Sequence, residues 1–143
     1  MAGAGADRFL IDTSAAARLR RPGVVERWSD ELSQGRVGMC DPTEAELLFS
    51  ARSVAECKQL GDRFAAIYTW HSVPEDAWQR AREMQLTLAQ AGCHRSAGVV
   101  DLLVAVTALH HRLTLLHYDR DFETIARHTG LQTHWLAEPG AIA

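Results

Sequence analysis

One stretch decides how the rest of the chain is interpreted: Val99-Val100-Asp101-Leu102-Leu103-Val104-Ala105-Val106. It predicts a buried helix over 99–111, too short for the roughly 20 apolar residues that cross a bilayer. No Lys or Arg lies between Ala97 and His111 to pair with Asp101. Because an unpaired buried charge is costly, this carboxylate needs a cation beside it. The simplest candidate is a divalent cation shared with other acids.

Outward from this helix, apolar runs of strand length alternate with helical stretches, which is the pattern of a parallel α/β sheet. We expect a single α/β/α domain over residues 1–143 with about five parallel strands, and residues 1–7 as a disordered N-terminal extension. The expected strands are 9–11, 36–40, 68–73, 113–117 and 131–136. The expected helices are 13–19, 24–32, 54–67, 74–91, 99–111 and 121–128. A further helix is expected after the second strand, with Asp41 as N-cap, Pro42 at its first position and Glu44 at its third.

Three further acids lie where these elements meet turns. Asp12 closes the strand 9–11, Asp119 follows the strand 113–117, and Glu46 lies inside the helix that follows Asp41. The carboxyl ends of parallel strands are where ligands bind, so Asp12 and Asp119 should meet at one edge of the sheet. For Asp101 the helix N-terminus contributes at most about 1 kcal/mol, which is too little to offset burial.

Each acid also has a simpler interpretation. Asp12 could cap the helix after it, Asp119 could be a turn residue, Asp121 could be an N-cap, and Asp101 could cap its own helix. Simple exposure of Asp101 is disfavoured by the Val and Leu residues around it. The joint placement of the acids favours a metal site over four unrelated structural roles.

The charge balance permits a phosphate-bearing partner without requiring one. The net charge is −3, but setting aside five of the 18 acids as members of a site leaves 13 acids against 15 bases. All but one of the bases are Arg, whose planar fork suits phosphate, although a GC-rich coding sequence produces the same bias. The five acids set aside are Asp12, Glu46, Asp101, Asp119 and Asp121.

Other classes of protein are disfavoured by what the chain lacks. No charged segment followed by an apolar leader is visible at the start, which predicts a cytoplasmic protein with no membrane association. The three cysteines and seven histidines show no spacing typical of a zinc site or a disulfide framework. Dinucleotide and P-loop nucleotide motifs are also missing.

Four segments, taken in order, resemble the PIN-domain ribonucleases, and most closely the VapC toxins of bacterial toxin–antitoxin pairs. The likeness covers nearly all of the chain, and one departure is His117, where relatives often carry Thr or Ser. The four segments are Phe9-Leu10-Ile11-Asp12-Thr13-Ser14, Thr43-Glu44-Ala45-Glu46-Leu47, Val100-Asp101-Leu102-Leu103-Val104-Ala105 and Leu115-Leu116-His117-Tyr118-Asp119-Arg120-Asp121-Phe122.

The resemblance implies roles for particular residues. The catalytic acids would be Asp12, Glu46, Asp101 and Asp119, and the ligands of Mg²⁺ or Mn²⁺ would be Asp12, Asp101, Asp119 and Asp121. Ser14, or Thr13 beside it, would supply a hydroxyl, and Arg95 and Arg120 would contact substrate. Arg18 and Arg20 are further candidates for holding phosphate, with plain solvated surface as the alternative for every one of these arginines.

The implied activity is a metal-dependent endoribonuclease toxin acting on single-stranded or loop RNA, in which the ion activates a water for attack on the phosphodiester. The implied partners are a second copy of the chain and a VapB-type antitoxin that inserts a basic side chain among the acids. Two other functions stay open: a PIN-like module that binds RNA or protein without cutting, and a small-molecule phosphohydrolase with an enclosed pocket. The intact set of mutually repelling acids favours the enzyme.

Overall fold

The computed structural model describes residues 7–143, and its five strands form one parallel sheet in the order β3-β2-β1-β4-β5. This confirms the expected fold class and strand number. The expectation of a disordered N-terminal extension falls on residues 1–6, outside the described range, and on the exposed Asp7. The strands are β1 (Phe9–Ile11), β2 (Val37–Met39), β3 (Thr69–Trp70), β4 (Thr114–His117) and β5 (Thr133–Trp135).

The centre of the sheet is β1, which pairs with β2 on one side and with β4 on the other. From β1 the chain builds outward to β2 and β3, and it then returns to add β4 and β5 on the opposite side. The strand order therefore reverses between β1 and β4. In an open α/β sheet this switch point is where ligands bind, beyond the carboxyl ends of the strands. Asp12 and Asp119 follow these two strands.

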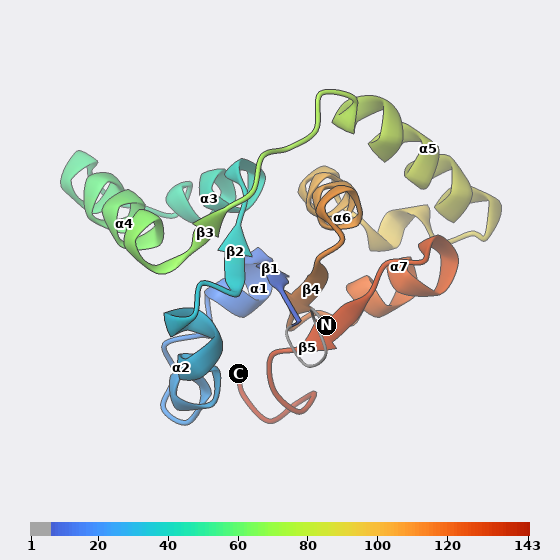
Figure 1. Cartoon of the computed structure of the whole chain (residues 1–143). Helices are drawn as coiled ribbons and strands as arrows, with labels where there is room; N and C mark the ends of the chain where they lie inside the picture. The colour runs from blue at the N-terminus through green and yellow to red at the C-terminus, as the bar shows by residue number, and fades with distance from the viewer. Residues whose placement is uncertain (1–6) are drawn as a thin grey trace.

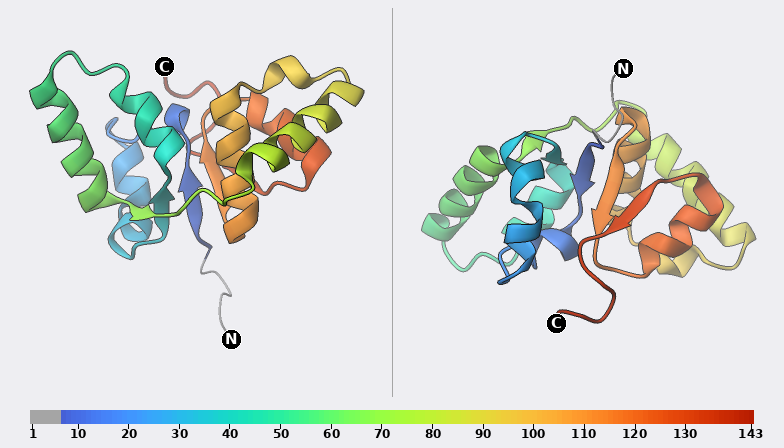
Figure 2. Two further views of the ribbon diagram at one scale, coloured as in Figure 1. Left: turned by 90° about the horizontal axis from the view of Figure 1, so that it is seen from above. Right: turned by 60° about the horizontal axis from the view of Figure 1, so that its bottom comes forward.

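Helices cover both faces of the sheet, which makes the domain three-layered. Figure 1 shows α5, α6 and α7 on one face and α1 and α2 on the other, and Figure 2 shows α3 and α4 to one side of β1. Among the described residues no helix is both long and apolar enough to cross a membrane. The helices are α1 (Thr13–Ala16), α2 (Val24–Ser33), α3 (Asp41–Leu48), α4 (Val54–Ile67), α5 (Ala77–Gln90), α6 (Val99–His111) and α7 (Asp121–Thr129), with a short 3₁₀ helix η1 (His94–Ser96) before α6.

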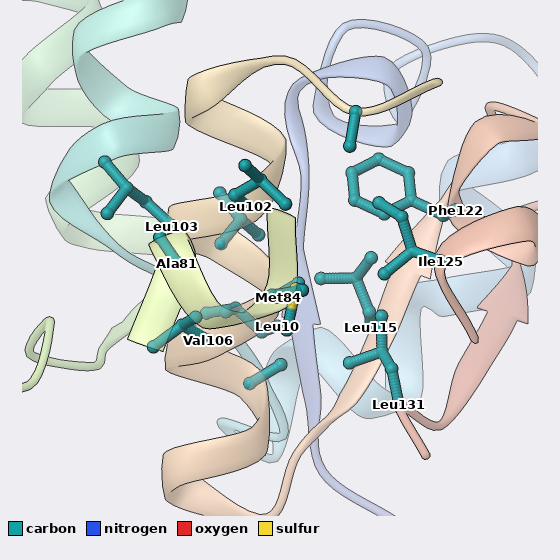
Figure 3. Packing of buried hydrophobic residues seen from close by; sticks show 14 of the residues in the cluster. Leu10, Ala81, Met84, Leu102, Leu103, Val106, Leu115, Phe122, Ile125 and Leu131 are labelled. Atoms are coloured by element: carbon teal, nitrogen blue, oxygen red, sulfur yellow. The ribbon is translucent and has the colours of Figure 1, made fainter. Parts of the chain in front are cut away.

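The alternation of side chains along the strands creates two separate cores. On β1, Leu10 faces the core made with α5, α6 and α7, whereas Phe9 and Ile11 face the core made with α1, α2 and α4. On β4, Leu115 and Leu116 divide in the same way. Figure 3 shows the first core, in which Leu10 and Leu115 meet the apolar side of α6. Both faces of the central strands are thus buried, and their polar residues are confined to the strand ends.

Two helices, α4 and α6, begin and end at the residues that the sequence predicts. The helix expected over 13–19 is wrong beyond Ala16, because the amides of Arg18 and Leu19 bond three residues back and tighten the chain into turns. The strand expected over 68–73 is reduced to Thr69–Trp70, an edge strand paired only with β2. The strand expected over 9–11 is confirmed with the same ends, and the other expected elements are confirmed with shifted ends.

The predicted entry to α3 is wrong by one residue. Cys40 is the N-cap, with no side-chain cap bond, and Asp41 is already the first helical residue. The carboxylate of Asp41 instead accepts a hydrogen bond from the indole N–H of Trp70, at 2.8 Å between Oδ1 and Nε1. The Asp41 side chain, predicted to cap the helix, therefore makes a tertiary contact with β3 instead.

Candidate active site

Asp12 is a buried acid at the carboxyl end of β1, with 4% of its surface exposed. Its Oδ1 accepts the backbone N–H of Ala15 at 3.0 Å, so the capping role considered from the sequence is real. The Ser14 hydroxyl lies 2.8 and 2.9 Å from the two carboxylate oxygens. Burial raises the pKa of Asp12 to about 6, against the lowering effect of these hydrogen bonds, and the charge of Asp101 raises it further.

Ser14 joins the ends of β1 and β4. Its Oγ donates to Asp12 and accepts the backbone N–H of Tyr118 at 2.9 Å. The neighbouring Thr13 hydroxyl donates to Oε1 of Glu46, which brings exposed Glu46 of α3 to the same edge of the sheet. The expected hydroxyls are present, and in this structure they hold acids in place. Their predicted contact with substrate stays a prediction.

Asp101 lies in the first turn of α6, where its Oδ2 accepts the backbone N–H of Gly98 at 3.1 Å. The residues from Leu102 to Ala108 are buried, whereas Asp101 itself is half-buried, so the prediction that this carboxylate is shielded from water is only partly confirmed. The first turn faces the open edge of the sheet instead of its core. Burial raises the pKa of Asp101 to about 6, and the charges of Asp119, Glu46 and Asp121 raise it further.

Asp119 and Asp121 lie at the junction between β4 and α7. The backbone N–H of Asp121 donates to Oδ1 of Asp119 at 2.9 Å, closing a turn between β4 and α7. Asp121 is exposed in the first turn of α7, and its pKa is raised by burial and by the charge of Asp119. The two carboxylates therefore share one turn and repel each other.

His117 has a role that the sequence left open. It is fully buried; its Nδ1 accepts the backbone N–H of Asp119 at 3.1 Å, and its Nε2 lies 2.7 Å from Oε2 of Glu123. Burial lowers the pKa of His117, and the hydrogen bond and charge of Glu123 oppose that shift. The only sequence signal was its position, at the end of a buried strand two residues before Asp119.

The candidate phosphate-binding arginines fall into two groups. Arg95 in η1 and Arg120, which lies between Asp119 and Asp121 in sequence, are exposed. Arg18 is engaged elsewhere: its guanidinium donates to the carbonyls of Ser14 and Ala143 and lies 5.2 Å from the centre of the Tyr118 ring. Arg95 and Arg120 therefore suit a phosphate better than Arg18 does.

These contacts gather the acids into one cluster, called the acid cluster here and made up of Asp12, Glu46, Asp101, Asp119 and Asp121. Asp101 interacts electrostatically with each of the other four. Within residues 7–143 none of the five lies within ion-pair distance of Lys, Arg or His; the contact of this kind found there is the hydrogen bond between His117 and Glu123.

The donor set of the acid cluster is the kind that hard divalent cations prefer. Carboxylate oxygens bind Mg²⁺ and Mn²⁺, and such an ion would offset the burial, and the smaller mutual repulsion, that raise the pKa values of Asp12 and Asp101. As the side chains stand, no group of three or more His, Cys, Asp or Glu in residues 7–143 is arranged to hold a metal. The acids fit the ion by their chemistry and common location, and binding would have to draw them closer together.

A mainly apolar groove of about 700 Å³ lies between α2 and α4. Its lining comes from the α1 turn, α2, α3 and α4, and it includes two basic side chains, Arg20 and Arg63. Two lining residues are close in sequence to residues of the site: Ala16 lies two residues after Ser14, and Leu47 is next to Glu46 in α3.

The chain is similar to known proteins over most of its length. A family model described as PIN domain matches residues 9–128. The chain is 37% identical over 133 residues to Ribonuclease VapC21 of Mycobacterium tuberculosis, which covers 93% of this chain and 96% of that protein. It is 34% identical over 136 residues to Ribonuclease VapC18 of the same species, covering 94% and 98%.

Solved structures of VapBC have a similar fold. DNA-bound VapBC from Salmonella typhimurium matches with a TM-score of 0.73 at 22% identity, covering 92% of this chain and 99% of that one. VapBC-1 from nontypeable Haemophilus influenzae matches with a TM-score of 0.72 at 24% identity, covering 90% and 97%.

Proposed function

The chain belongs to the PIN domain family, and we propose that it is a VapC-type endoribonuclease toxin, a hydrolase of RNA phosphodiester bonds neutralised by a VapB-type antitoxin. The observation that carries this proposal is the acid cluster at the β1/β4 switch point. Burial and the charges of neighbouring acids raise the pKa values of Asp12 and Asp101, so keeping these carboxylates together costs free energy. A module that only bound RNA or protein would gain nothing from that cost.

We propose that the enzyme depends on Mg²⁺ or Mn²⁺ held by Asp12, Asp101, Asp119 and Asp121. Such an ion would acidify a water and stabilise the charge that develops on the phosphodiester. Ser14 keeps Asp12 oriented, and Thr13 keeps Glu46 beside the same edge. Arg95 and Arg120, which are exposed, would hold the RNA phosphates.

The purified protein should cut single-stranded RNA when Mg²⁺ or Mn²⁺ is present and should be inactive in excess EDTA. The reason is that the acids alone cannot neutralise the charge that develops on the phosphodiester. The measurement is gel analysis of a folded RNA and an unstructured RNA, with nucleoside monophosphates as a second substrate class. Cleavage that persists in EDTA contradicts the metal dependence, and hydrolysis of monophosphates alone would identify a small-molecule phosphohydrolase.

We further propose that the apolar groove between α2 and α4 receives the VapB-type antitoxin. An apolar segment lying there would bury its side chains against Leu47 and Phe64, and Arg20 and Arg63 would pair with its acidic residues. A segment that continued from the groove past Leu47 would reach the neighbouring Glu46, where a basic side chain would meet the carboxylates. Occupancy of the groove would thus block the site by direct contact.

Ala66→Trp should weaken the antitoxin complex, because Ala66 is exposed on α4 and lines the groove, so that an indole there occupies the antitoxin's space. Overpacking of this kind costs about 1–3 kcal/mol, which corresponds to a roughly 5- to 150-fold rise in Kd. The control is Ala65→Trp, an exposed neighbour outside the groove lining, which should bind as the parent does. RNA cleavage should be unaffected in both. Equal antitoxin affinity of the two variants would place the antitoxin elsewhere.

A homodimer and a cytoplasmic location, both expected from the sequence, complete the proposal. Apolar surface suited to a second copy is present on α5, where Trp78 and Leu86 are 67% and 60% exposed.

A further inference from the structure

Both ring nitrogens of His117 have roles fixed by their partners. The backbone N–H of Asp119 can only donate, so Nδ1, 3.1 Å away, must offer its lone pair. The ring proton therefore lies on Nε2, which faces Oε2 of Glu123 at 2.7 Å, and a carboxylate oxygen can accept it. The geometry selects one neutral tautomer with a donor side and an acceptor side.

The ring is also prevented from turning. Oε2 of Glu123 accepts a second hydrogen bond from the Thr133 hydroxyl at 2.7 Å, which fixes the carboxylate between α7 and β5. The imidazole packs against the rings of Phe122 and Trp135, with centroids 5.4 and 4.8 Å away. His117 thus joins β4, α7 and β5 at the point where the chain turns toward the acid cluster.

We propose that His117 is a positioning residue that sets the Asp119 carboxylate for the metal, with Glu123 and Thr133 holding the ring in the required orientation. This inference rests on the proposed metal-dependent function. His117 holds the amide of Asp119, and the amide of Asp121 holds Oδ1 of Asp119. Oδ2 of Asp119 makes no hydrogen bond within the described residues, so this oxygen is available as a ligand.

Two substitutions test the hydrogen bonds of Nδ1 and Nε2 separately. In His117→Asn the amide oxygen takes the place of Nδ1 and can accept the N–H two residues on, as in an Asx-turn, while the bond to Glu123 is lost. In His117→Gln the longer side chain reaches Glu123, and the N–H of Asp119 loses its acceptor. Each variant removes one buried hydrogen bond, so a purely structural role predicts similar behaviour of the two.

The readout is the Kd for Mn²⁺, measured by calorimetry on the metal-free protein, with RNA cleavage measured alongside. Loss of an outer partner of a metal ligand typically costs about 10- to 100-fold in affinity, and we expect a rise of this size for His117→Gln. His117→Asn should stay close to the parent. Glu123→Gln is the second control: its amide oxygen can still accept from both His117 and Thr133, so its Kd should also match the parent's.

The possible outcomes distinguish this inference from the function on which it rests. Equal Kd values for the Asn and Gln variants, in a protein whose parent binds Mn²⁺ and cuts RNA, overturn the positioning role alone. A parent that binds no Mn²⁺ removes both proposals. A parent that binds Mn²⁺ without cutting RNA contradicts the proposed function, while the ratio of the two variants' Kd values still decides the role of His117.

Discussion

Asp101→Asn should abolish RNA cleavage and leave the protein folded. Asp101 interacts with each of the other members of the acid cluster, so its charge is the one that a shared cation would use most. The amide oxygen of Asn can still accept the N–H of Gly98 and keep the entry to α6. Loss of a ligand should exceed the roughly 10- to 100-fold effect of losing an outer partner. The measurement is the initial rate of cleavage in Mn²⁺.

The matched control for this substitution is Asp30→Asn, the same chemical change at an exposed acid of α2, away from the acid cluster. It should cut RNA at the parent rate. Circular dichroism and a thermal melt establish that both variants fold. Undiminished cleavage by a folded Asp101→Asn protein would show that Asp101 is a helix cap and that the cation binds elsewhere.

Metal-free Asp101→Asn should gain stability over the parent as the pH rises from 5 to 7. In the parent the pKa of Asp101 is raised from 3.8 to about 6, so the folded state holds a proton that the unfolded state has released. Stability is therefore lost as the pH climbs through the folded pKa, by up to about 1 kcal/mol over this range after allowance for solvent screening. His71 and His117, with lowered pKa values, act in the opposite direction but are common to both proteins.

Adding Mn²⁺ should make the parent more stable than Asp101→Asn. An ion bound only by the folded state at 100 times its Kd stabilises the parent by about 2.7 kcal/mol, and Asp101→Asn should lose most of that gain. Urea unfolding at pH 5, 6 and 7, with and without Mn²⁺, measures both effects. A metal-free variant much less stable than the parent, with a full response to Mn²⁺, would contradict the assignment of Asp101 to the metal site.

The elements with strong local signals were predictable from the sequence to the residue. Ser53 caps α4 by accepting the N–H of Glu56, and Asp101, the third residue of α6, accepts the N–H of the N-cap residue Gly98. The wrong predictions concern residues whose structure depends on a partner far away in the sequence. Asp41 was assigned to a cap, yet it bonds the indole of Trp70, 29 residues away. The predicted strand over 68–73 is too long, because β-propensity reports how well side chains fit a sheet and does not show where pairing stops. As an edge strand β3 pairs with β2 alone, and this pairing ends after two residues.

The location of the acid cluster follows from a general rule, because Asp12 and Asp119 end strands that must be parallel. The supports of these acids do not follow from any local pattern. Ser14 reaches the amide of Tyr118, and His117 reaches Glu123, only after β1, β4 and α7 have packed together. The degree of burial of Asp101 was likewise only partly predicted, since its neighbours in sequence face the core and it faces the edge.

The pairing of β1 with β4 has a consequence for synthesis of the chain. Ser14 and Tyr118 are 104 residues apart, and their hydrogen bond closes the edge on which Asp12 lies. While the ribosome is still making the helices between these strands, β1 lacks its β4 neighbour, and the last two acids of the cluster have not been polymerised. Contacts of such long sequence separation form late. The acid cluster therefore cannot be complete before Asp121 has been synthesised.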